Sequence, residues 1–325
     1  MPPFVLTLVV PVFNEAEAIA PFIETVTRVF NGQTTVNIEF VFINDGSTDS
    51  TLDRLLASQR GDTRIRIVDL SRNFGKEAAL TAGLHVACGD AVVPIDADLQ
   101  DPPELIPEMI EKWRQGNEVV LARRIDRQSD SWGKRASARW FYRLHNWISQ
   151  PKLPDNVGDF RLMDRRVVEA IKELGESRRF MKGLFAWVGF RTAYIDYVRP
   201  PRETGSTKFN GWKLWNLALE GVTSFSTAPL RIWTYIGFFV ALISFVFALF
   251  IMIKVLVIGR DVPGYASLMV VISFLGGIQI MGIGIIGEYL GRAYMESKRR
   301  PVFLIRQIYE PGQIMALRQK DFSGN

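Results

Sequence analysis

The 325-residue sequence predicts a mostly parallel α/β domain followed by two membrane-spanning helices. Apolar runs of strand length alternate with residues at helical apolar spacing, at intervals of roughly 25 residues, which is typical of repeated βα units. A polar cluster follows each of the first four apolar runs. In the last third of the chain, two nearly uninterrupted apolar stretches are each long enough to cross a bilayer as a helix.

The composition limits the classes of partner. The formal charge is +5, and the basic residues concentrate near the apolar stretches, which favours an anionic membrane surface or a phosphorylated ligand over nucleic acid. The single cysteine, Cys88, excludes an intrachain disulfide, and no His or Asn motif marks it as a nucleophile. The apolar start, Pro3 to Val12, has no basic segment or cleavage site, so it predicts a first strand and not a signal peptide.

The first βα unit begins with Phe4 to Val12, a Val- and Leu-rich run typical of a central parallel strand. We expect Asn14 to cap the helix that follows, with Glu15 and Glu17 in its first turn. Apolar residues at helical spacing predict this helix: Ile19, Phe22, Ile23, Val26 and Phe30.

The second unit begins with a strand from Ile38 to Ile43. It ends in Asn44-Asp45-Gly46-Ser47-Thr48, where Gly46 permits a tight turn. Ser47 or Thr48 is expected to cap the next helix, which carries Leu52, Leu55 and Leu56.

The remaining soluble elements follow from the same patterns. They are a strand from Ile65 to Leu70, a helix reaching Ala87, a strand from Ala91 to Ile95, a helix from Pro103 to Gln115, and strands from Glu118 to Ala122 and Tyr194 to Val198. The polar clusters that follow the strands should lie at one edge of the sheet, where a nucleotide could bind. No G-x-G-x-x-G follows the first strand and no G-x-x-x-x-G-K-[ST] occurs, so a dinucleotide fingerprint and a P-loop are both unsupported.

An acidic pair, Asp96 and Asp98, ends the fourth strand. Residues i and i+2 of a strand point to the same side, so both carboxylates can converge at the edge of the sheet. Two carboxylates there suit Mg²⁺ or Mn²⁺, which bind carboxylates together with substrate phosphates. The alternative is a solvated acidic turn, because Asp101-Pro102-Pro103 follows.

Two later segments each allow two interpretations. A basic segment interleaved with aromatic residues is either a helix with a solvated face or a phosphate clamp beside a membrane; it holds Arg123, Arg124, Arg127, Lys134, Arg135 and Arg139. Gly158-Asp159-Phe160 is either a plain turn or part of a site. The polar segment from Arg199 to Asn210 is typical of loops that cover a ligand.

The C-terminal third predicts a membrane hairpin. Gly211 to Phe225 is an amphipathic segment with two Trp residues, which either lies at the interface or packs on the preceding domain. The apolar stretches run from Ile232 to Gly259 and from Tyr265 to Gly287, and glycines in the second should let helices approach closely. Basic residues 298–300 follow them, while the loop between them is neutral, so the positive-inside rule places both termini in the cytoplasm.

Four motifs occur together in order: Pro11-Val12-Phe13-Asn14-Glu15, Asn44-Asp45-Gly46-Ser47, Asp96-Ala97-Asp98-Leu99-Gln100 and Gly158-Asp159-Phe160. This set resembles the inverting family 2 glycosyltransferases with a GT-A fold. The segment from Lys208 to Trp215 and the two spans narrow the resemblance to polyprenyl-phosphate glycosyltransferases, in particular the bactoprenol glucosyltransferases of the GtrB type. The Gln-x-x-Arg-Trp motif of processive synthases is missing, which disfavours a polymerase.

The resemblance implies a GT-A domain over residues 1–209, an amphipathic juxtamembrane helix over 210–231, a transmembrane hairpin over 232–291 and a cytoplasmic tail over 292–325. It implies inverting transfer of glucose from UDP-glucose to undecaprenyl phosphate, with Mg²⁺ or Mn²⁺, at the cytoplasmic face of a bacterial inner membrane. Membrane lipids and a second copy of the chain are the other expected partners, and nucleic acid is not. Transfer of mannose or aminoarabinose, or a non-catalytic nucleotide-sugar binder anchored in the membrane, remain alternatives.

The resemblance also implies roles for individual residues. The nucleotide-sugar would be bound by Pro11, Phe13, Glu15, Asp45, Lys76 and Asp96. The metal would be bound by Asp96 and Asp98 with Gln100, and the lipid phosphate by Arg123, Arg135 and Lys208. Asp159 matches the candidate base, but a phosphate monoester has a second pKa of about 6 and is mostly ionised at pH 7. We therefore expect Asp159 to orient the acceptor more than to deprotonate it.

Overall fold

The computed structural model describes residues 3–125, 157–176, 179, 181–198, 228–258 and 264–311. The described residues divide into a unit holding those before residue 199 together with 300–311, and a second unit holding those from 228 to 299. The predicted basic segment beyond Arg124, the loop from Arg199 to Asn210, the amphipathic helix from Gly211 to Phe225 and the loop at Arg260 lie mainly or wholly outside the described residues.

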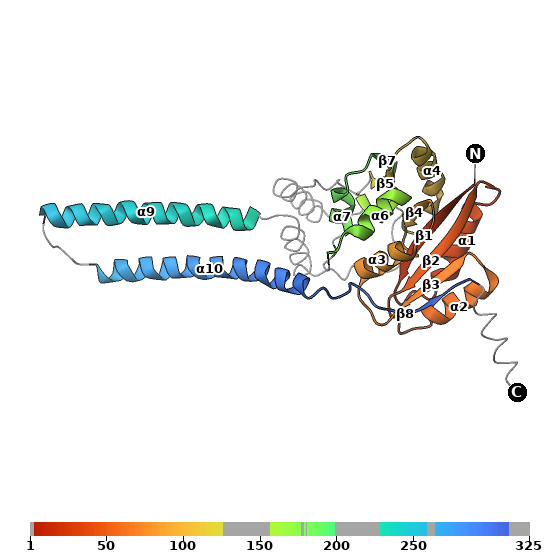
Figure 1. Cartoon of the computed structure of the whole chain (residues 1–325), viewed down its shortest axis with the longest axis horizontal. Coiled ribbons are helices and arrows are strands. Elements are labelled where there is room, and N and C mark those ends of the chain that lie inside the picture. The colour runs from red at the N-terminus through yellow and green to blue at the C-terminus, as the bar shows by residue number, and fades with distance from the viewer. Residues whose placement is uncertain are drawn as a thin grey trace, which may run out of the picture. The chain divides into compact units, whose positions relative to one another are not determined.

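An eight-stranded sheet forms the first unit, in the order β7-β5-β6-β4-β1-β2-β3-β8 (Figure 1). The strands are β1 (Phe4–Val12), β2 (Val36–Asn44), β3 (Ile65–Leu70), β4 (Ala91–Pro94), β5 (Val119–Arg124), β6 (Val157–Asp164), β7 (Thr192–Tyr197) and β8 (Ile305–Tyr309). Parallel pairing joins β1 to β2 and β4, β2 to β3, and β5 to β7. Strand β6 is antiparallel to β4 and β5, and β8 is antiparallel to β3. The predicted mostly parallel α/β fold is confirmed.

Helices cover the sheet between these strands. They are α1 (Ile19–Val29), α2 (Thr51–Gly61), α3 (Lys76–Val86), the 3-10 turn η1 (Pro103–Leu105), α4 (Ile106–Arg114), α6 (Arg165–Glu173) and α7 (Met181–Trp187). The predicted segments from Phe4 to Arg114 match these elements to within a few residues at each end.

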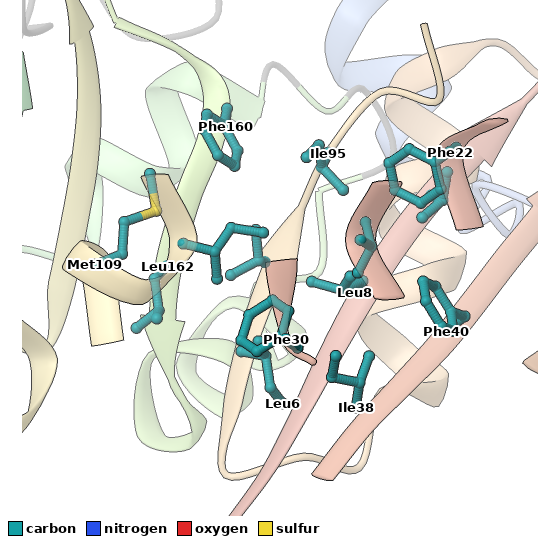
Figure 2. Close-up of a cluster of buried hydrophobic side chains, with 14 of the residues drawn as sticks. Leu6, Leu8, Phe22, Phe30, Ile38, Phe40, Ile95, Met109, Phe160 and Leu162 are labelled. Atoms are coloured by element: carbon teal, nitrogen blue, oxygen red, sulfur yellow. The ribbon is translucent and has the colours of Figure 1, made fainter. Parts of the chain in front are cut away.

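The core fills both faces of the sheet. On one face, alternate residues of β1 such as Leu6 and Leu8 pack with Phe22 of α1 and Phe40 of β2 (Figure 2). On the other face, α3 approaches so closely that a Cβ on Gly83 would lie 2.3 Å from Val9 Cγ1. Tight packing of this kind transmits strain and leaves little freedom for the strand ends, so the loops that follow the strands are held in place.

The predicted helix caps are wrong. Helix α1 begins after Ala18 with no acidic residue in its first turn, and α2 begins after Ser50 with no side-chain cap. Asn14, at φ +54°, instead accepts the Thr48 amide at 2.8 Å, and its own amide donates to Ser47 Oγ at 3.0 Å. The reason is tertiary: parallel pairing brings the ends of β1 and β2 together, so their polar side chains satisfy each other's backbone.

The segment predicted as a tail contributes a strand that the sequence analysis did not anticipate. Residues Ile305–Tyr309 form β8, which pairs with β3 at the edge of the sheet. The Ser71 amide also donates to Leu304 O at 2.9 Å, and Gln59 Nε2 donates to Tyr309 O at 2.8 Å. The chain therefore returns to the first unit after its last long helix.

Two long helices, α9 (Ala228–Ile258) and α10 (Tyr265–Ser297), form the second unit. Within them, Ile232–Ile251 and Val270–Ser297 are long and apolar enough to cross a membrane. A Cβ on Gly282 of α10 would lie 1.9 Å from Trp233 Nε1 of α9, so this glycine makes room for the indole as predicted for close helix contact. Glu288 accepts a hydrogen bond from Arg292 at 3.0 Å, as the i,i+4 spacing predicts.

Candidate active site

A cavity of about 360 Å³ opens where the carboxyl ends of β4 and β5 meet the beginning of β6. Because β6 is antiparallel to both, its first residues lie beside their last ones. The lining residues are Pro11, Lys76, Leu80, Pro94, Ile95, Asp96, Asp98, Asp101, Arg124, Gly158, Asp159, Phe160 and Lys182. This is the edge of the sheet at which the sequence predicts a nucleotide site, and Asp159 lies there in a strand and not in a turn.

Lys76 joins two carboxylates that are 63 residues apart in the chain. Its Nζ lies 2.6 Å from Asp96 Oδ1 and 3.3 Å from Asp159 Oδ2. Burial would lower the pKa of Lys76, but the two carboxylates outweigh it and raise that pKa above its usual value. Burial raises the pKa of Asp96 although Lys76 opposes the shift. The cluster is therefore a charged network with Lys76 as its cation.

Asp159 stays ionised at neutral pH. Burial would raise its pKa, but Lys76, Lys182 and Arg161 together lower it below the usual value. Its Oδ1 is buried and has no hydrogen-bond partner among the described residues. A carboxylate with a lowered pKa is a weak base, and a carboxylate oxygen without a hydrogen-bond partner among the described residues keeps its capacity to accept from a ligand group or to bind a metal.

Arg161 fixes the backbone that carries Asp159. Its guanidinium is buried, donates to Gly158 O at 2.6 Å and Asp159 O at 3.3 Å, and stacks on Phe185 at 3.9 Å from the ring centroid. Burial lowers the pKa of Arg161 to about 10, so the group still carries its charge at pH 7. Residue Arg161 thus holds both the position and the ionised state of the neighbouring carboxylate.

Asp96 and Asp98 fit a divalent cation as part of a shared site. Both line the cavity, and Asp98 Oδ1 also accepts the Gln100 amide at 3.1 Å. Among the residues that the structure describes, no group of three or more His, Cys, Asp or Glu side chains is placed to hold a metal. Mg²⁺ commonly uses only one or two carboxylates and takes its other ligands from substrate phosphates and water. Gln100 was expected to help bind the metal, but it does not line the cavity. It contacts the acidic pair through its backbone amide, which donates to Asp98 Oδ1.

The residues predicted to hold the nucleotide separate into two groups. Pro11, Lys76 and Asp96 line the cavity. The others lie on neighbouring loops: Phe13 is 43% exposed, and Asp45 is buried, with its carboxylate accepting the amides of Phe74 at 2.7 Å and Gly75 at 2.9 Å.

Glu15 adds a third carboxyl group near the acidic pair. Burial, followed by the charges of Asp96 and Asp98, raises the pKa of Glu15 to about 7. This carboxyl is therefore partly protonated at neutral pH while no cation is bound. A bound cation would oppose the effect of the acidic pair and favour the ionised form.

The predicted phosphate-binding residues are placed less simply. Arg123 does not line the cavity and pairs with Asp196 at 2.6 Å, while Arg135 and Lys208 lie outside the described residues. The cations that do line the cavity, besides Lys76, are Arg124 and Lys182. Adjacent residues of a strand point to opposite faces of the sheet, so only one of Arg123 and Arg124 can line the cavity. Nothing in the sequence around Lys182 marks it; its place depends on the packing of α7.

The environments of these two cations differ. Arg124 donates to Tyr197 Oη at 3.1 Å and lies 3.6 Å from Asp101 Oδ1, so it is already engaged. Lys182 has no carboxylate within 4.0 Å among the described residues. Lys182 therefore differs from Lys76, whose ammonium group is already held by two carboxylates.

Comparisons with known proteins agree on the family. Residues 7–172 match glycosyl transferase family 2, and residues 228–293 match the GtrB C-terminal hairpin. The chain is 58% identical to the bactoprenol glucosyl transferase of Shigella phage SfV over 301 residues, which cover 93% of this chain and 98% of that protein. It is 55% identical to a prophage bactoprenol glucosyl transferase homolog of Escherichia coli K12 over 303 residues, covering 93% and 99%.

One similarity to a solved structure supports the fold. Glucosyl-3-phosphoglycerate synthase from Mycobacterium tuberculosis, crystallised with Mn²⁺, UDP and phosphoglyceric acid, superposes with a TM-score of 0.50 at 21% identity. The match covers 68% of this chain and 76% of that one. At this identity the likeness concerns the arrangement of strands and helices.

Proposed function

The chain belongs to glycosyl transferase family 2, and from this premise we propose that it transfers glucose, with inversion, from UDP-glucose to a polyprenyl phosphate. The observation that carries the proposal is the 58% identity with a bactoprenol glucosyl transferase over 98% of that protein's length. The cavity supports it, because its lining combines two lysines and an arginine with four Asp residues, a set of charges that suits a diphosphate, a cation and a second anion.

Donor binding is assigned to the edge formed by β1, β2 and β4. We assign the nucleotide to the loops that carry Pro11, Phe13 and Asp45, and the diphosphate to the space beside Asp96 and Asp98. A divalent cation bound there would neutralise the diphosphate and stabilise the charge that develops on departing UDP. Without it, the two carboxylates would repel the donor.

Acceptor binding is assigned to the side of the cavity formed by β6 and α7. The acceptor is an anion, so the ionised Asp159 needs cations beside it, and Lys76, Lys182 and Arg161 all contribute. Lys182 would hold the acceptor phosphate, and the carboxylate of Asp159 would orient it through a cation that the two anions share. An already ionised phosphate oxygen then attacks the anomeric carbon from the face opposite to UDP, which gives inversion in one displacement.

We base the proposed membrane topology on the path of the chain. Residues 300–311 belong to the same folded unit as the sheet, and both ends of the segment holding α9 and α10 connect to that unit. If α9 and α10 each cross the bilayer once, the chain returns to the side from which it left. The proposal places this side in the cytoplasm because basic residues follow α10.

The test is transfer by the full-length protein in detergent. Labelled UDP-glucose, UDP-galactose and GDP-mannose are each offered with undecaprenyl phosphate and Mg²⁺ or Mn²⁺. We expect lipid-linked product from UDP-glucose, its loss with EDTA, and its recovery when the metal is restored. If only GDP-mannose gives product, the transferred sugar is mannose and not glucose. If none of the donors gives product, the non-catalytic alternative is supported.

A pair of matched variants tests the metal site. Asp96→Asn should weaken UDP binding and abolish most transfer, because it removes one of the two carboxylates beside the diphosphate. Asp90→Asn is the control, since Asp90 accepts the Val5 amide at 2.8 Å outside the cavity. Equal activity of the two variants, or full activity of the wild type in metal-free buffer, would remove the metal from the mechanism.

A further inference from the structure

Strand β8 is bound to the end of β3 and to the loop that follows it by side-chain contacts as well as by the sheet. Arg306 Nη1 donates to Asp69 Oδ2 at 3.1 Å, and its Nη2 donates to Ser71 O at 2.7 Å. Asp69 lies at a bulge one residue before the end of β3 and is only 1% exposed. One guanidinium from the C-terminal strand therefore holds both a buried carboxylate and the backbone of the next loop.

The buried carboxylate passes this contact on to β2. Asp69 Oδ1 accepts a hydrogen bond from Asn44 Nδ2 at 2.8 Å, and Asn44 Oδ1 accepts the Ser47 amide at 3.2 Å. Asn44 is also buried, so water does not compete for the hydrogen bond between these two side chains. A continuous path of hydrogen bonds thus runs from Arg306 to the turn that contains Asp45.

The two loops are packed directly on each other. Gly46 has φ +64°, and a Cβ there would lie 2.4 Å from Arg72 C. Asp45 accepts both the Phe74 and Gly75 amides. Since Lys76 follows at once and begins α3, any loosening of this pair of loops would displace the donor side of the cavity.

We propose that Arg306 is a positioning residue for donor binding: through Asp69, Asn44 and Ser71 it holds the loops that follow β2 and β3, which we assign to the nucleotide, in place against each other. The inference rests on the proposed function, because it assumes that these loops bind the nucleotide. It assigns a role in donor affinity to a strand that follows the second long helix and lies far in sequence from every motif.

The expected effect comes from the state of Asp69. A buried carboxylate that loses its cation is left uncompensated, and the structure around it is expected to rearrange. This rearrangement disturbs Asn44 and the turn after it, whereas no hydrogen bond of the path from Arg306 includes Asp159 or Lys182. Arg306→Met should therefore raise the KM for UDP-glucose about tenfold, which corresponds to about 1.4 kcal/mol, and leave kcat within about twofold.

A matched control lies at the other end of the same strand pair. Arg66 binds Glu310 at 2.8 Å and Glu39 at 3.0 Å, so Arg66→Met also removes an ion pair that holds the C-terminal segment. It touches neither loop. We expect an unchanged KM for UDP-glucose in Arg66→Met and a partial recovery in Arg306→Lys, which keeps the charge but cannot reach both acceptors in the same fork geometry.

The measurements are transfer kinetics, UDP calorimetry and thermal unfolding of the wild type and the three variants. A rise in KM in Arg306→Met that is smaller in Arg306→Lys and missing in Arg66→Met, with similar unfolding temperatures of the two Met variants, supports the proposal. An unchanged KM in Arg306→Met, or an equal rise in both Met variants, overturns it. Failure of the wild type to bind UDP or transfer glucose would instead reject the proposed function.

Discussion

Replacing Asp159 by Asn separates donor binding from chemistry at the acceptor. The substitution removes one negative charge and nearly preserves shape. In the wild type, Oδ2 lies 3.3 Å from Lys76 Nζ and Oδ1 has no hydrogen-bond partner among the described residues. In the variant the amide oxygen can keep the contact with Lys76, so the amide nitrogen takes the place of the unpartnered oxygen.

The size of the effect follows from that geometry. Lys76 keeps Asp96 at 2.6 Å, so the donor side retains its cation and UDP should bind with near-normal affinity. An NH₂ group facing the acceptor cannot accept a hydrogen bond or share a cation with it. We expect kcat to fall about 10²-fold, or about 2.7 kcal/mol, the lower end of the usual loss for a positioned acid–base group.

The pH dependence gives a second readout. The pKa of Asp159 is lowered by Lys76, Lys182 and Arg161 despite burial, so its charge does not change near neutral pH. The acceptor monoester has a second pKa of about 6, so the reactive dianion is protonated at lower pH. Wild type and variant should therefore share the same decline of kcat below about pH 6 and a flat profile above it.

The assay pairs UDP calorimetry with transfer kinetics, using Asp164→Asn as the control. Asp164 lies on the same strand, outside the cavity, and caps α6 by accepting the Arg166 amide, which Asn can also do. Normal turnover in Asp159→Asn would refute the reasoning and leave Asp159 as a structural residue of β6. Loss of UDP binding in that variant would place Asp159 on the donor side instead.

Three further predictions test other parts of the molecule. Lys182→Met should raise the KM for polyprenyl phosphate about tenfold with the KM for UDP-glucose unchanged, because a lysine without an ion pair among the described residues is lost from the acceptor side; an equal change in both would reject this assignment. In a cysteine-free variant, a cysteine replacing Gly264 should react with an impermeant thiol reagent in intact cells and one replacing Ser297 should not, and the reverse pattern would contradict the hairpin. Burial, and next Asp159, raises the pKa of Glu77 from 4.5 to about 7, so the folded state binds more protons and its stability falls as pH rises through this window; Glu77→Gln should remove this fall and gain up to about 3 kcal/mol at pH 8, measured by thermal unfolding at pH 5 and 8.

Much of the fold could be predicted from the sequence because its information is local. The Val- and Leu-rich run from Phe4 to Val12 and the helical spacing after it depend only on which residues recur at which interval. The same holds for the apolar stretches in α9 and α10. The acidic pair was recognisable because two carboxylates at i and i+2 follow an apolar run, although β4 ends at Pro94 and both carboxylates lie in the loop after it.

The predicted helix caps show the limit of reasoning from local sequence. Asn14 and Ser47 have the side chains of helix caps, yet they bond to each other's loops across the sheet. A cap competes with any other donor that the fold brings close, and the pairing of β1 with β2 brings such donors. Sequence position alone cannot tell which partner wins.

The sequence by itself determined the α/β class, the two apolar spans and the set of motifs that identify the family. Only the tertiary structure decided that antiparallel β6 carries Asp159 to Asp96, that Lys76 joins them, that Arg124 and not Arg123 enters the cavity, and that β8 returns to β3. The physical reason is that periodicity and strand ends are properties of neighbouring residues. Charge pairing at the site joins residues tens to hundreds of positions apart, and these meet only after the sheet has set its strand order.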